Sequence, residues 1–372
     1  MYPFVKQFIS YSGDFNFGML ILDVKGNFYK QVKHYAELFN RIDDLYVIEL
    51  GGKIKYNPLD KPNLKPSVLA NRLKTILTLF SPNNPESYWI DKAEEVLTEA
   101  IKLCRLYNNG YVTFIELHKL VNSPDYYCEK VEHMRQLFRS GTLSASQIYD
   151  LHSAITFFEN EYKTLDSRVL SILKSEISRM TNIFVSDYDI QNTFCPNKND
   201  INFTGFEDVI HNGKIVVLNM NIAMYKNLSK LIAAYLKLDF QTEILSQLSK
   251  GDAKPVVFMC DEFHEYVTTT DSEFFAQSRE AKCINIVATQ SYTSLLNTLK
   301  DQYSTKAIIQ NLVNKLWYRT DDTFTIEDAQ KQIGKEDKTK ISKSISENAQ
   351  ETNYNYITNS LNSRNSGVSE SI

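Results

Sequence analysis

The chain has 372 residues, of which 43% are hydrophobic and 23% are charged, so it can bury a large core and is predicted to hold two domains plus a tail. Its formal net charge of −4 argues against a protein that simply coats DNA, although a ring-shaped translocase can be acidic outside and basic only along its channel. The five cysteines show neither a C-x-x-C pair nor zinc-ligand spacing, which indicates reduced thiols of a cytoplasmic protein.

The first strand signal is the run MLILDVKGNFY at residues 19–29, an apolar stretch that ends in polar residues. Residues 1–18 contain no apolar run long enough to span a membrane, and they lack the basic start and apolar core of a signal peptide. A helix, a short strand around LYVIEL at residues 45–50 and the sequence KYNPLD follow. Prolines then mark a loop before a predicted helix at residues 68–80.

The middle of the chain is predicted to be helical. After a break at residues 81–87, SPNNPES, residues 88–194 carry helical periodicity with hardly any strand signal. Six tyrosines between Tyr107 and Tyr162 have the chemistry to stack on nucleobases, but packing between helices is the favoured interpretation. This segment is therefore predicted to be an all-helical domain.

From residue 201 to about residue 322 the alternating strand and helix pattern returns. Four apolar runs, IVVLN, PVVFMC, CINIV and KLWYR, are separated by helical segments, which predicts a parallel sheet flanked by helices. Beyond Gly334 the sequence is polar with few apolar residues, as in a flexible tail or the remains of a longer C-terminal domain. The predicted domains are residues 1–87 and 195–334, which form the two parts of one α/β domain, 88–194, the helical insert, and 335–372, the tail.

Two adjacent carboxylates, Asp261 and Glu262, follow the apolar run PVVFMC directly. An apolar strand of this kind is buried in a parallel sheet, so acids can occur only at its carboxyl end, where such sheets bind ligands. The segment resembles the Walker B strand of nucleoside triphosphatases, in which Asp261 would hold Mg²⁺ through water and Glu262 would orient or deprotonate the attacking water. The alternative interpretation is a core strand that runs into an acidic loop.

The next predicted strand ends in a polar pair, Thr289 and Gln290. Two parallel strands joined by a helix form one right-handed βαβ unit, so both polar ends are expected at the same edge of the sheet. Gln290 is then placed to sense a γ-phosphate or to position the attacking water. The alternative is a strand end that bonds its own loop.

The expected phosphate loop is missing from the sequence. A loop of the form G-x-x-x-x-G-K-[S/T] is needed because its backbone amides cradle the phosphates and its lysine reaches the terminal ones. None of the 12 glycines begins one, and the nearest segments, GGKI at 51–54 and GKI at 213–215, lack the spacing and the hydroxyl residue. We therefore expect that the chain as written is not a competent ATPase.

The order of these segments resembles the conjugative coupling proteins of type IV secretion systems, the TraD and TraG group, over about residues 17–335. That family consists of membrane-anchored, hexameric ATPases related to FtsK and HerA translocases, with an all-helical domain inserted in a RecA-like motor. In it, a D-x-K-G motif ends one strand and an N-P-L motif follows the next. Asp23, Lys25 and Gly26 match the first motif, and residues 57–59, Asn-Pro-Leu, match the second.

The resemblance implies an ATP- and Mg²⁺-dependent motor that links DNA and relaxosome proteins to a type IV secretion channel. It would act as a homo-hexamer anchored to the inner face of the cytoplasmic membrane, with a TraM recognition site and with the helical domain as the partner surface. Asp23, Lys25 and Asp261 would contact nucleotide or Mg²⁺. An arginine from a neighbouring subunit would reach the γ-phosphate, and Arg279 and Arg319 are the candidates, although ordinary surface charge is the alternative for both.

In this family the P-loop lies just upstream of the D-x-K-G strand, so the expectation is an N-terminally truncated coupling protein. The competing hypothesis is a P-loop-less, non-enzymatic adaptor or scaffold that binds DNA-transfer proteins. An unrelated RecA-like enzyme with a degenerate phosphate loop is disfavoured, because no glycine-rich strand-to-helix turn is available.

His264 has no second histidine or cysteine at ligand spacing and is interpreted as a loop residue. The lysines at 53 and 55 and at 335–343 are interpreted as solvated surface.

Overall fold

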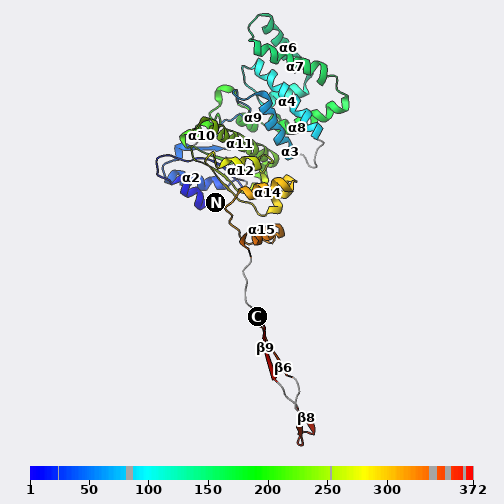
Figure 1. The fold of residues 1–372 in the computed structure, drawn as a ribbon. Helices are drawn as coiled ribbons and strands as arrows, with labels where there is room; N and C mark the ends of the chain where they lie inside the picture. The colour runs from blue at the N-terminus through cyan, green and yellow to red at the C-terminus, as the bar shows by residue number, and fades with distance from the viewer. Residues whose placement is uncertain are drawn as a thin grey trace. The chain divides into compact units, whose positions relative to one another are not determined.

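The computed structural model describes the backbone of residues 1–23, 25–80, 87–251, 254–334, 342–347, 353–362 and 366–371 (Figure 1). The chain forms two compact units, Met1–Tyr318 and Arg319–Ile372. Residues 81–86 of the predicted break and residues 335–341 of the predicted lysine-rich cluster lie outside the described residues. In the part of the chain that the structure describes, no helix is both long enough and apolar enough to cross a membrane.

The first unit is built on a five-stranded parallel sheet with the strand order β2-β3-β1-β4-β5. Its strands are β1 (Gly18–Asp23), β2 (Leu45–Ile48), β3 (Ile215–Asn219), β4 (Val256–Cys260) and β5 (Cys283–Val287). Asp23 pairs with Asn219, and Leu22 pairs with Cys260, which itself pairs with Val287. The carboxyl ends of the four strands β3, β1, β4 and β5 therefore meet at one edge.

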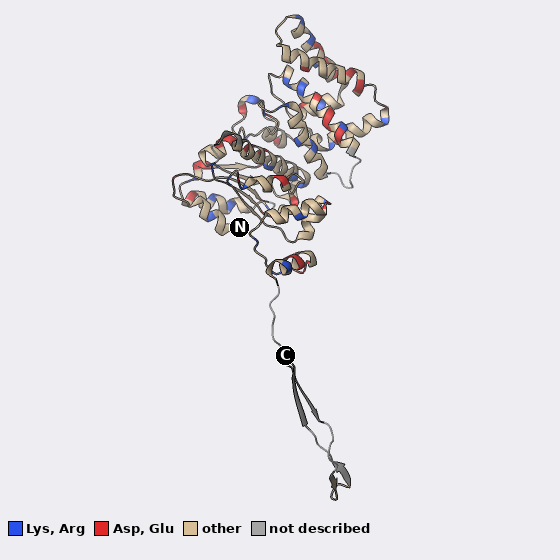
Figure 2. Cartoon of the chain, viewed as in Figure 1, with Lys and Arg blue, Asp and Glu red and all other residues tan. Residues whose placement is uncertain are grey.

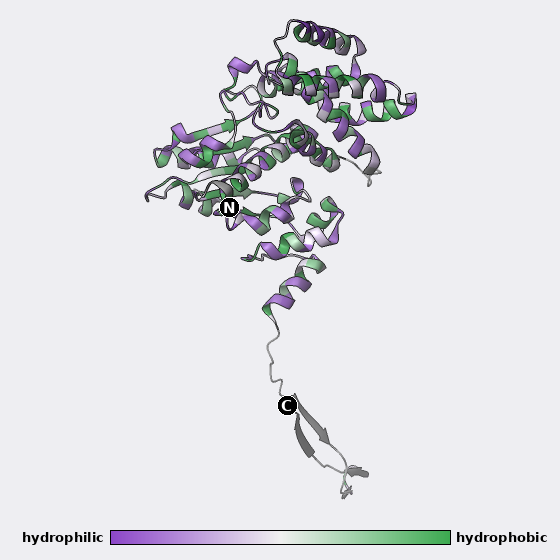
Figure 3. Ribbon diagram, turned by 45° about the horizontal axis from the view of Figure 1, so that its top comes forward, coloured by the Kyte–Doolittle hydropathy of each residue, from purple (hydrophilic) through white to green (hydrophobic). Residues whose placement is uncertain are grey.

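Helices cover both faces of this sheet (Figures 1 and 3). On one face, α1 (Tyr2–Ile9) and α2 (Phe28–Leu38) share a core cluster with the side chains of Met19 and Ile21. On the other face, α11 (Ile222–Lys250) places the Phe240 ring 6.2 Å from that of Phe258. Every residue of β1 and β4 is consequently buried, which explains why these strands read as continuous apolar runs. The predicted α/β class with a parallel sheet flanked by helices is confirmed.

The remaining elements of this part of the chain are short, apart from α3. They are α3 (Pro66–Phe80), α10 (Phe206–Asn212), α12 (Asp271–Ser278), α13 (Tyr292–Leu299), α14 (Gln302–Asn311) and the 3-10 turns η1 (Ile42–Asp44), η3 (Lys198–Asp200) and η4 (Phe263–Glu265). Helix α11 begins at Ile222 and is interrupted at Lys226, whose φ of 39° and ψ of −113° are not helical.

Between α3 and α9 the chain is helical, as predicted, and the described residues of 87–194 contain no strand. The helices are α4 (Ser87–Tyr107), α5 (Phe114–Asn122), α6 (Pro124–Arg139), α7 (Ala145–Thr156), the π-helical turn η2 (Phe157–Tyr162), α8 (Ser167–Ser186) and α9 (Tyr188–Phe194). Reciprocal capping boxes, Thr113 with Glu116 and Ser144 with Gln147, start α5 and α7. The buried rings of Tyr127 and Phe158, 5.0 Å apart, show tyrosine used in helix packing.

The N-P-L motif connects this helical segment to the sheet. Asn57 is buried, its side-chain oxygen accepts a hydrogen bond from Leu59 N at 3.0 Å, and its Nδ2 donates to the carbonyl of Val112 at 2.7 Å. Tyr56 N donates to the carbonyl of Thr193 at 2.9 Å. The motif and the tyrosine before it therefore have a structural use, because they bond one loop to the α4–α5 connection and to the end of α9.

One predicted strand is wrong. KLWYR, at residues 315–319, was expected to extend the sheet, but residues 312–322 form neither strand nor complete helix. Leu316 and Tyr318 are 72% and 84% exposed. A strand is stable only when a neighbour completes its hydrogen bonds and one face is buried, and the described residues supply neither to this segment. The sheet consequently ends at β5.

The second unit contains α15 (Thr323–Ile333) and two short antiparallel pairs. Strand β6 (Ser342–Glu347) pairs with β9 (Ser366–Ser371), and β7 (Asn353–Asn355) pairs with β8 (Ser360–Asn362). The domain boundaries at residues 87, 194 and 334, and the flexible character of the tail, stay predictions.

Candidate functional site

The candidate site lies at the carboxyl edge of the sheet, where three strands end in charged or amide side chains. Asp23 closes β1 and Lys25 follows it, Asp261 and Glu262 follow β4, and Gln290 lies three residues beyond β5. The pairing of β1 with β4 and of β4 with β5 brings these strand ends side by side. The predicted meeting of the D-E and T-Q strand ends at one edge is present in the structure, and the D-x-K-G segment lies at the same edge.

Glu262 is the centre of this group. Its carboxylate accepts a hydrogen bond from Gln290 Nε2 at 3.2 Å and lies 3.5 Å from the Lys25 ammonium. The side chain is 14% exposed, and the backbone has a φ of 48° and a ψ of 51°, a left-handed conformation that is uncommon for a non-glycine residue. Strained residues held by their surroundings are frequent at functional sites. Glu262 thus lies between Lys25, which follows β1, and Gln290, which follows β5. Its catalytic role stays a prediction.

His264 belongs to the same group, although its sequence context indicated only a loop residue. Its Nδ1 is 3.2 Å from the Thr289 hydroxyl and 3.7 Å from Glu262, and its Nε2 is 3.7 Å from Glu265. The short turn η4 brings the imidazole back over the strand ends. No metal-ligand spacing in the sequence marks this residue, so only the tertiary contact with Thr289 identifies it.

Asp23 has a structural use that limits its availability to a ligand. The residue is 1% exposed, and its two carboxylate oxygens accept hydrogen bonds from Lys25 N at 2.9 Å and from Phe28 N at 2.6 Å. The carboxylate thereby shapes the turn into α2 and fixes where the Lys25 side chain leaves the chain. Lys25 itself is 60% exposed and points its ammonium at Glu262.

Gly26 completes this turn with a φ of 70°, and a Cβ at this position would lie 3.1 Å from Asn221 Cβ. Asn221 Nδ2 in turn donates to the carbonyl of Lys25 at 2.9 Å. We expect Gly26→Ala to destabilise the chain by about 2 kcal/mol, from left-handed strain plus this contact. The matched control is Gly51→Ala, because Gly51 has a φ of 67° with no atom within 4 Å; it should cost about 1 kcal/mol. Urea unfolding of both variants measures the difference, and equal losses would contradict the role of Asn221.

Asp261 is a half-buried carboxyl with excess negative charge around it. Burial, then the neighbouring Glu262, raises the pKa of Asp261 above its ordinary value, against the smaller opposing effect of Lys25. Its backbone N–H donates to the carbonyl of Leu22 at 3.2 Å, which fixes the residue at the end of β4. A nearby cation would stabilise the ionised form of this carboxyl, as expected of a residue that holds Mg²⁺ through water.

This shift predicts that Asp261→Asn stabilises the chain by about 0.5–1 kcal/mol at pH 7. A folded-state pKa above the unfolded one means that ionisation of Asp261 destabilises the fold above that pKa and has no effect below the unfolded pKa. The advantage of the variant should therefore shrink as the pH falls through the pKa of the folded carboxyl. Urea unfolding across this range measures it, and a constant difference between variant and parent would contradict the assignment.

The two candidate arginines are not part of this group. Arg279 is exposed and follows α12, four residues before the start of β5, which places it near the amino edge of the sheet. Arg319 is exposed and is the first residue of the second unit. Arg279 therefore does not serve the site within its own chain, and the action of either arginine on a neighbouring subunit stays a prediction.

The site residues fit part of a Mg²⁺–nucleotide complex. Asp261 and Glu262 are suited to a cation held through water, while no group of three or more metal-ligating side chains gathers among the described residues. The phosphate part does not fit, since no glycine-rich loop of the required spacing occurs in the sequence. No hydrolytic step can be derived from these residues without a phosphate cradle.

Behind the site lies a fully buried ion pair that sequence inspection missed. Lys237, on α11, and Asp271, which opens α12, are both 0% exposed and form a short salt bridge. Lys237 Nζ also donates to the carbonyl of Tyr266 at 2.6 Å and to the Thr268 hydroxyl at 3.1 Å. The Asp271 carboxylate accepts from Gln241 Nε2 at 2.8 Å. This pair fixes the far end of the loop that carries Glu262. A lysine within an otherwise apolar helix face was the available signal.

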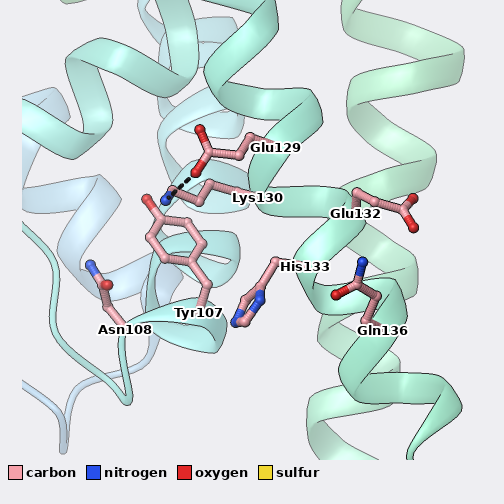
Figure 4. Close-up of a pocket in the computed structure, with 7 residues that line it drawn as sticks. All are labelled: Tyr107, Asn108, Glu129, Lys130, Glu132, His133 and Gln136. Carbon is pink, nitrogen blue, oxygen red and sulfur yellow. Dashed lines mark hydrogen bonds and ion pairs between the residues drawn. The ribbon is translucent and has the colours of Figure 1, made fainter.

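A separate hollow of about 480 Å³ lies in the helical segment, between the end of α4 and α6 (Figure 4). It is lined by Tyr107, Asn108, Glu129, Lys130, Glu132, His133 and Gln136. Lys130 pairs with Glu129 at 3.1 Å and lies 5.3 Å from the Tyr107 ring centre, so its charge is already satisfied. Acidic and basic residues are interspersed along these helices, with no stretch of one sign (Figure 2). The hollow has no nucleophile–base pair and no charge of one sign to define a ligand.

Comparison with known proteins shows which proteins the chain is similar to. Residues 255–369 match the family described as "TraM recognition site of TraD and TraG". The fold is similar to that of the bacterial conjugative coupling protein TrwBdeltaN70 in its unbound monoclinic form, with a TM-score of 0.53, 12% identity, and coverage of 95% of this chain and 76% of that one. It is also similar to the plasmid coupling protein TrwB in complex with ADP and Mg²⁺, with a TM-score of 0.50, 9% identity, and coverage of 83% and 75%. A search of curated proteins found no match.

Proposed function

Because the chain resembles the type IV coupling proteins, in the sequence of residues 255–369 and in its RecA-like fold, we propose that it acts in conjugative DNA transfer. Its motor would link a DNA substrate and its relaxosome to a type IV secretion channel in an ATP-dependent way. The observation that carries the proposal is the grouping of Lys25, Glu262 and Gln290 at the carboxyl edge of the sheet. This is the edge at which parallel α/β sheets bind ligands.

The proposed division of roles follows from the contacts. Asp261 holds Mg²⁺ through water, Glu262 is the general base or orients the attacking water, and Gln290 connects Glu262 to the neighbouring strand. Lys25 neutralises Glu262 and can move toward a phosphate because its side chain is 60% exposed. Arg279 of an adjacent subunit in a hexamer is the proposed source of the transition-state charge.

The proposed partners follow from the family match. A TraM recognition site within residues 255–369 supports contact with a relaxosome protein, and the helical segment offers a further partner surface. DNA would pass along the ring axis, where the basic residues of channel loops are concentrated, so the net charge of −4 does not oppose this function.

The second candidate function is a non-enzymatic adaptor that binds DNA-transfer proteins without turnover. The absence of a G-x-x-x-x-G-K-[S/T] loop from the sequence favours it. In an adaptor, Glu262 and Gln290 would serve only to fix the ends of β4 and β5.

The deciding experiment measures ATP binding and turnover by the 372-residue chain with Mg²⁺, with and without single- or double-stranded DNA. DNA-stimulated turnover that Glu262→Gln lowers by about 10²–10⁴-fold would support the motor. Asn160→Asp, on the exposed surface of the helical segment, is the control that should change neither binding nor turnover. Lack of nucleotide binding by this chain would agree with the missing phosphate loop and would support either a truncated motor or the adaptor.

A further inference from the structure

The imidazole of His264 joins the ends of β4 and β5 beside the candidate site. Its Nδ1 lies 3.2 Å from the Thr289 hydroxyl, and the side chain is 14% exposed. The Thr289 hydroxyl donates to the carbonyl of Ser291 at 3.2 Å. A hydroxyl has one proton to donate, so it accepts from His264, and this bonding pattern assigns the proton of the neutral imidazole to Nδ1. The contact with Thr289 therefore requires the Nδ1–H tautomer.

Two further bonds hold the backbone on either side of this imidazole. Phe263 N donates to the carbonyl of Ala288 at 2.7 Å, which joins the turn η4 to the residue after β5. The Thr298 hydroxyl donates to the carbonyl of His264 at 2.8 Å, which joins the same turn to α13. The ring of His264 therefore reaches Thr289 from a backbone that two other elements keep in place.

Gln290 lies inside the short turn that Thr289 closes. The bond from the Thr289 hydroxyl to the carbonyl of Ser291 leaves Gln290 as the middle residue, and its Nε2 donates from there to Glu262 at 3.2 Å. Glu262 has a φ of 48° and a ψ of 51°, a conformation that persists only where the surroundings hold it. Its second carboxylate oxygen lies 3.7 Å from Nδ1 of His264, so the protonated nitrogen faces the negative charge.

The imidazole is better shielded from water than the other charged neighbour of Glu262. The Lys25 side chain is 60% exposed, so water can replace its ammonium at the carboxylate. On the far side of the ring, Nε2 lies 3.7 Å from Glu265, which is itself paired with Lys230 of α11 at 2.5 Å. His264 is thus enclosed between Glu262, the end of β5 and an ion pair on α11.

We propose that His264 is a positioning residue for the pair formed by Glu262 and Gln290. Its Nδ1–H holds the Thr289 hydroxyl, and Thr289 sets the turn from which Gln290 reaches Glu262. A catalytic group keeps its geometry only when hydrogen bonds behind it fix its rotamer. The catalytic consequence rests on the function proposed above, whereas the arrangement itself exists without nucleotide and is measured without it.

The test is an NMR comparison of the 372-residue chain, labelled at its histidine and glutamine nitrogens, with its variants. In the parent, neutral His264 should carry its proton on Nδ1, and one Gln290 Nε2 proton should show the shift of a bonded amide. His264→Phe keeps a ring of similar size but has no donor. We expect it to move the Gln290 signals most of the way to their position in Glu262→Ala, which removes the partner itself. His264→Asn, whose amide nitrogen takes the place of Nδ1, should return them toward the parent.

His118→Phe is the matched control. Nδ1 of His118 likewise lies near a threonine hydroxyl, that of Thr181 at 2.9 Å, but this pair belongs to the helical segment. The variant should leave the Gln290 signals unchanged. Thr289→Val removes the acceptor while His264 stays in place, and it should displace Gln290 as His264→Phe does. It supplies the answer where His264→Phe does not fold, and urea unfolding establishes which variants are folded.

Parent-like Gln290 signals in folded His264→Phe or Thr289→Val would overturn the proposal, and so would an equal displacement in His118→Phe or a proton on Nε2 of His264. Turnover is a separate readout. In a parent that hydrolyses ATP, His264→Phe should lower kcat by about 10²-fold with little change in KM, and an unchanged kcat would overturn the catalytic consequence. A parent without turnover would count against the motor alone, because the NMR comparison needs no nucleotide.

Discussion

Lys237→Met is expected to lower the free energy of unfolding by about 3–5 kcal/mol. Lys237 and Asp271 are both 0% exposed, and the ammonium also holds Tyr266 O and the Thr268 hydroxyl. Loss of the ammonium leaves a buried carboxylate whose remaining partners are the Gln241 amide and the backbone N–H and hydroxyl of Thr268, all of them neutral. Urea unfolding monitored by circular dichroism measures the effect.

The matched control is Lys230→Met, two turns earlier on the same helix. Lys230 contacts Glu265 at 2.5 Å, but these side chains are 35% and 29% exposed, so its loss should cost no more than about 1 kcal/mol. The double variant Lys237→Met/Asp271→Leu removes both charges and should recover most of the loss, because no unpaired charge remains buried. Equal losses of unfolding free energy for Lys230→Met and Lys237→Met would show that burial of the ion pair does not affect stability.

Asp239→Leu is expected to cost a similar amount, about 3–5 kcal/mol. The carboxylate lies 2.6 Å from the Lys61 ammonium and 3.0 Å from an Arg72 guanidinium nitrogen, and it accepts from the Tyr56 hydroxyl at 3.2 Å. Asp239 is 5% exposed. Its removal leaves two cations close together and away from water, with no anion between them. Thermal unfolding measures the loss.

Glu94→Leu provides the comparison for Asp239. Glu94 also accepts from two donors, Lys74 Nζ at 2.8 Å and Asn71 Nδ2 at 3.0 Å, but it lies on the surface of α4 with 24% of its side chain exposed. Water can replace these partners, so the variant should lose no more than about 1 kcal/mol. A cost for Asp239→Leu as small as that for Glu94→Leu would contradict a structural role of the Asp239 cluster.

Both buried clusters connect segments on which the proposed function depends. Lys237 fixes the loop between β4 and α12, which carries Glu262, to the long helix α11. Asp239, two residues further along α11 and on its other side, fixes the loop after the N-P-L motif through Lys61, and fixes α3 through Arg72. Helix α11 therefore contacts both the loop that carries Glu262 and the loop and helix that precede the helical segment.

The sequence by itself determined the elements that depend on local pattern. Apolar runs predicted β1, β3 and β4, because strands buried on both faces have no polar alternation, whereas the predicted strand β5 contains Asn285 and is buried only in part. Helical periodicity predicted the helical insert, and the polar strand ends predicted that Glu262 and Gln290 would meet at one edge. The order of the motifs along the chain indicated the resemblance to the coupling proteins.

Only the tertiary structure decided which of these residues touch. The contact of Lys25 with Glu262, the return of His264 to Thr289 and the burial of Lys237 with Asp271 all join positions distant in sequence, where pattern carries no information. The segment KLWYR has the composition of a strand, yet it forms no strand in the part of the chain that the structure describes, because a strand depends on a neighbour that the segment itself cannot specify.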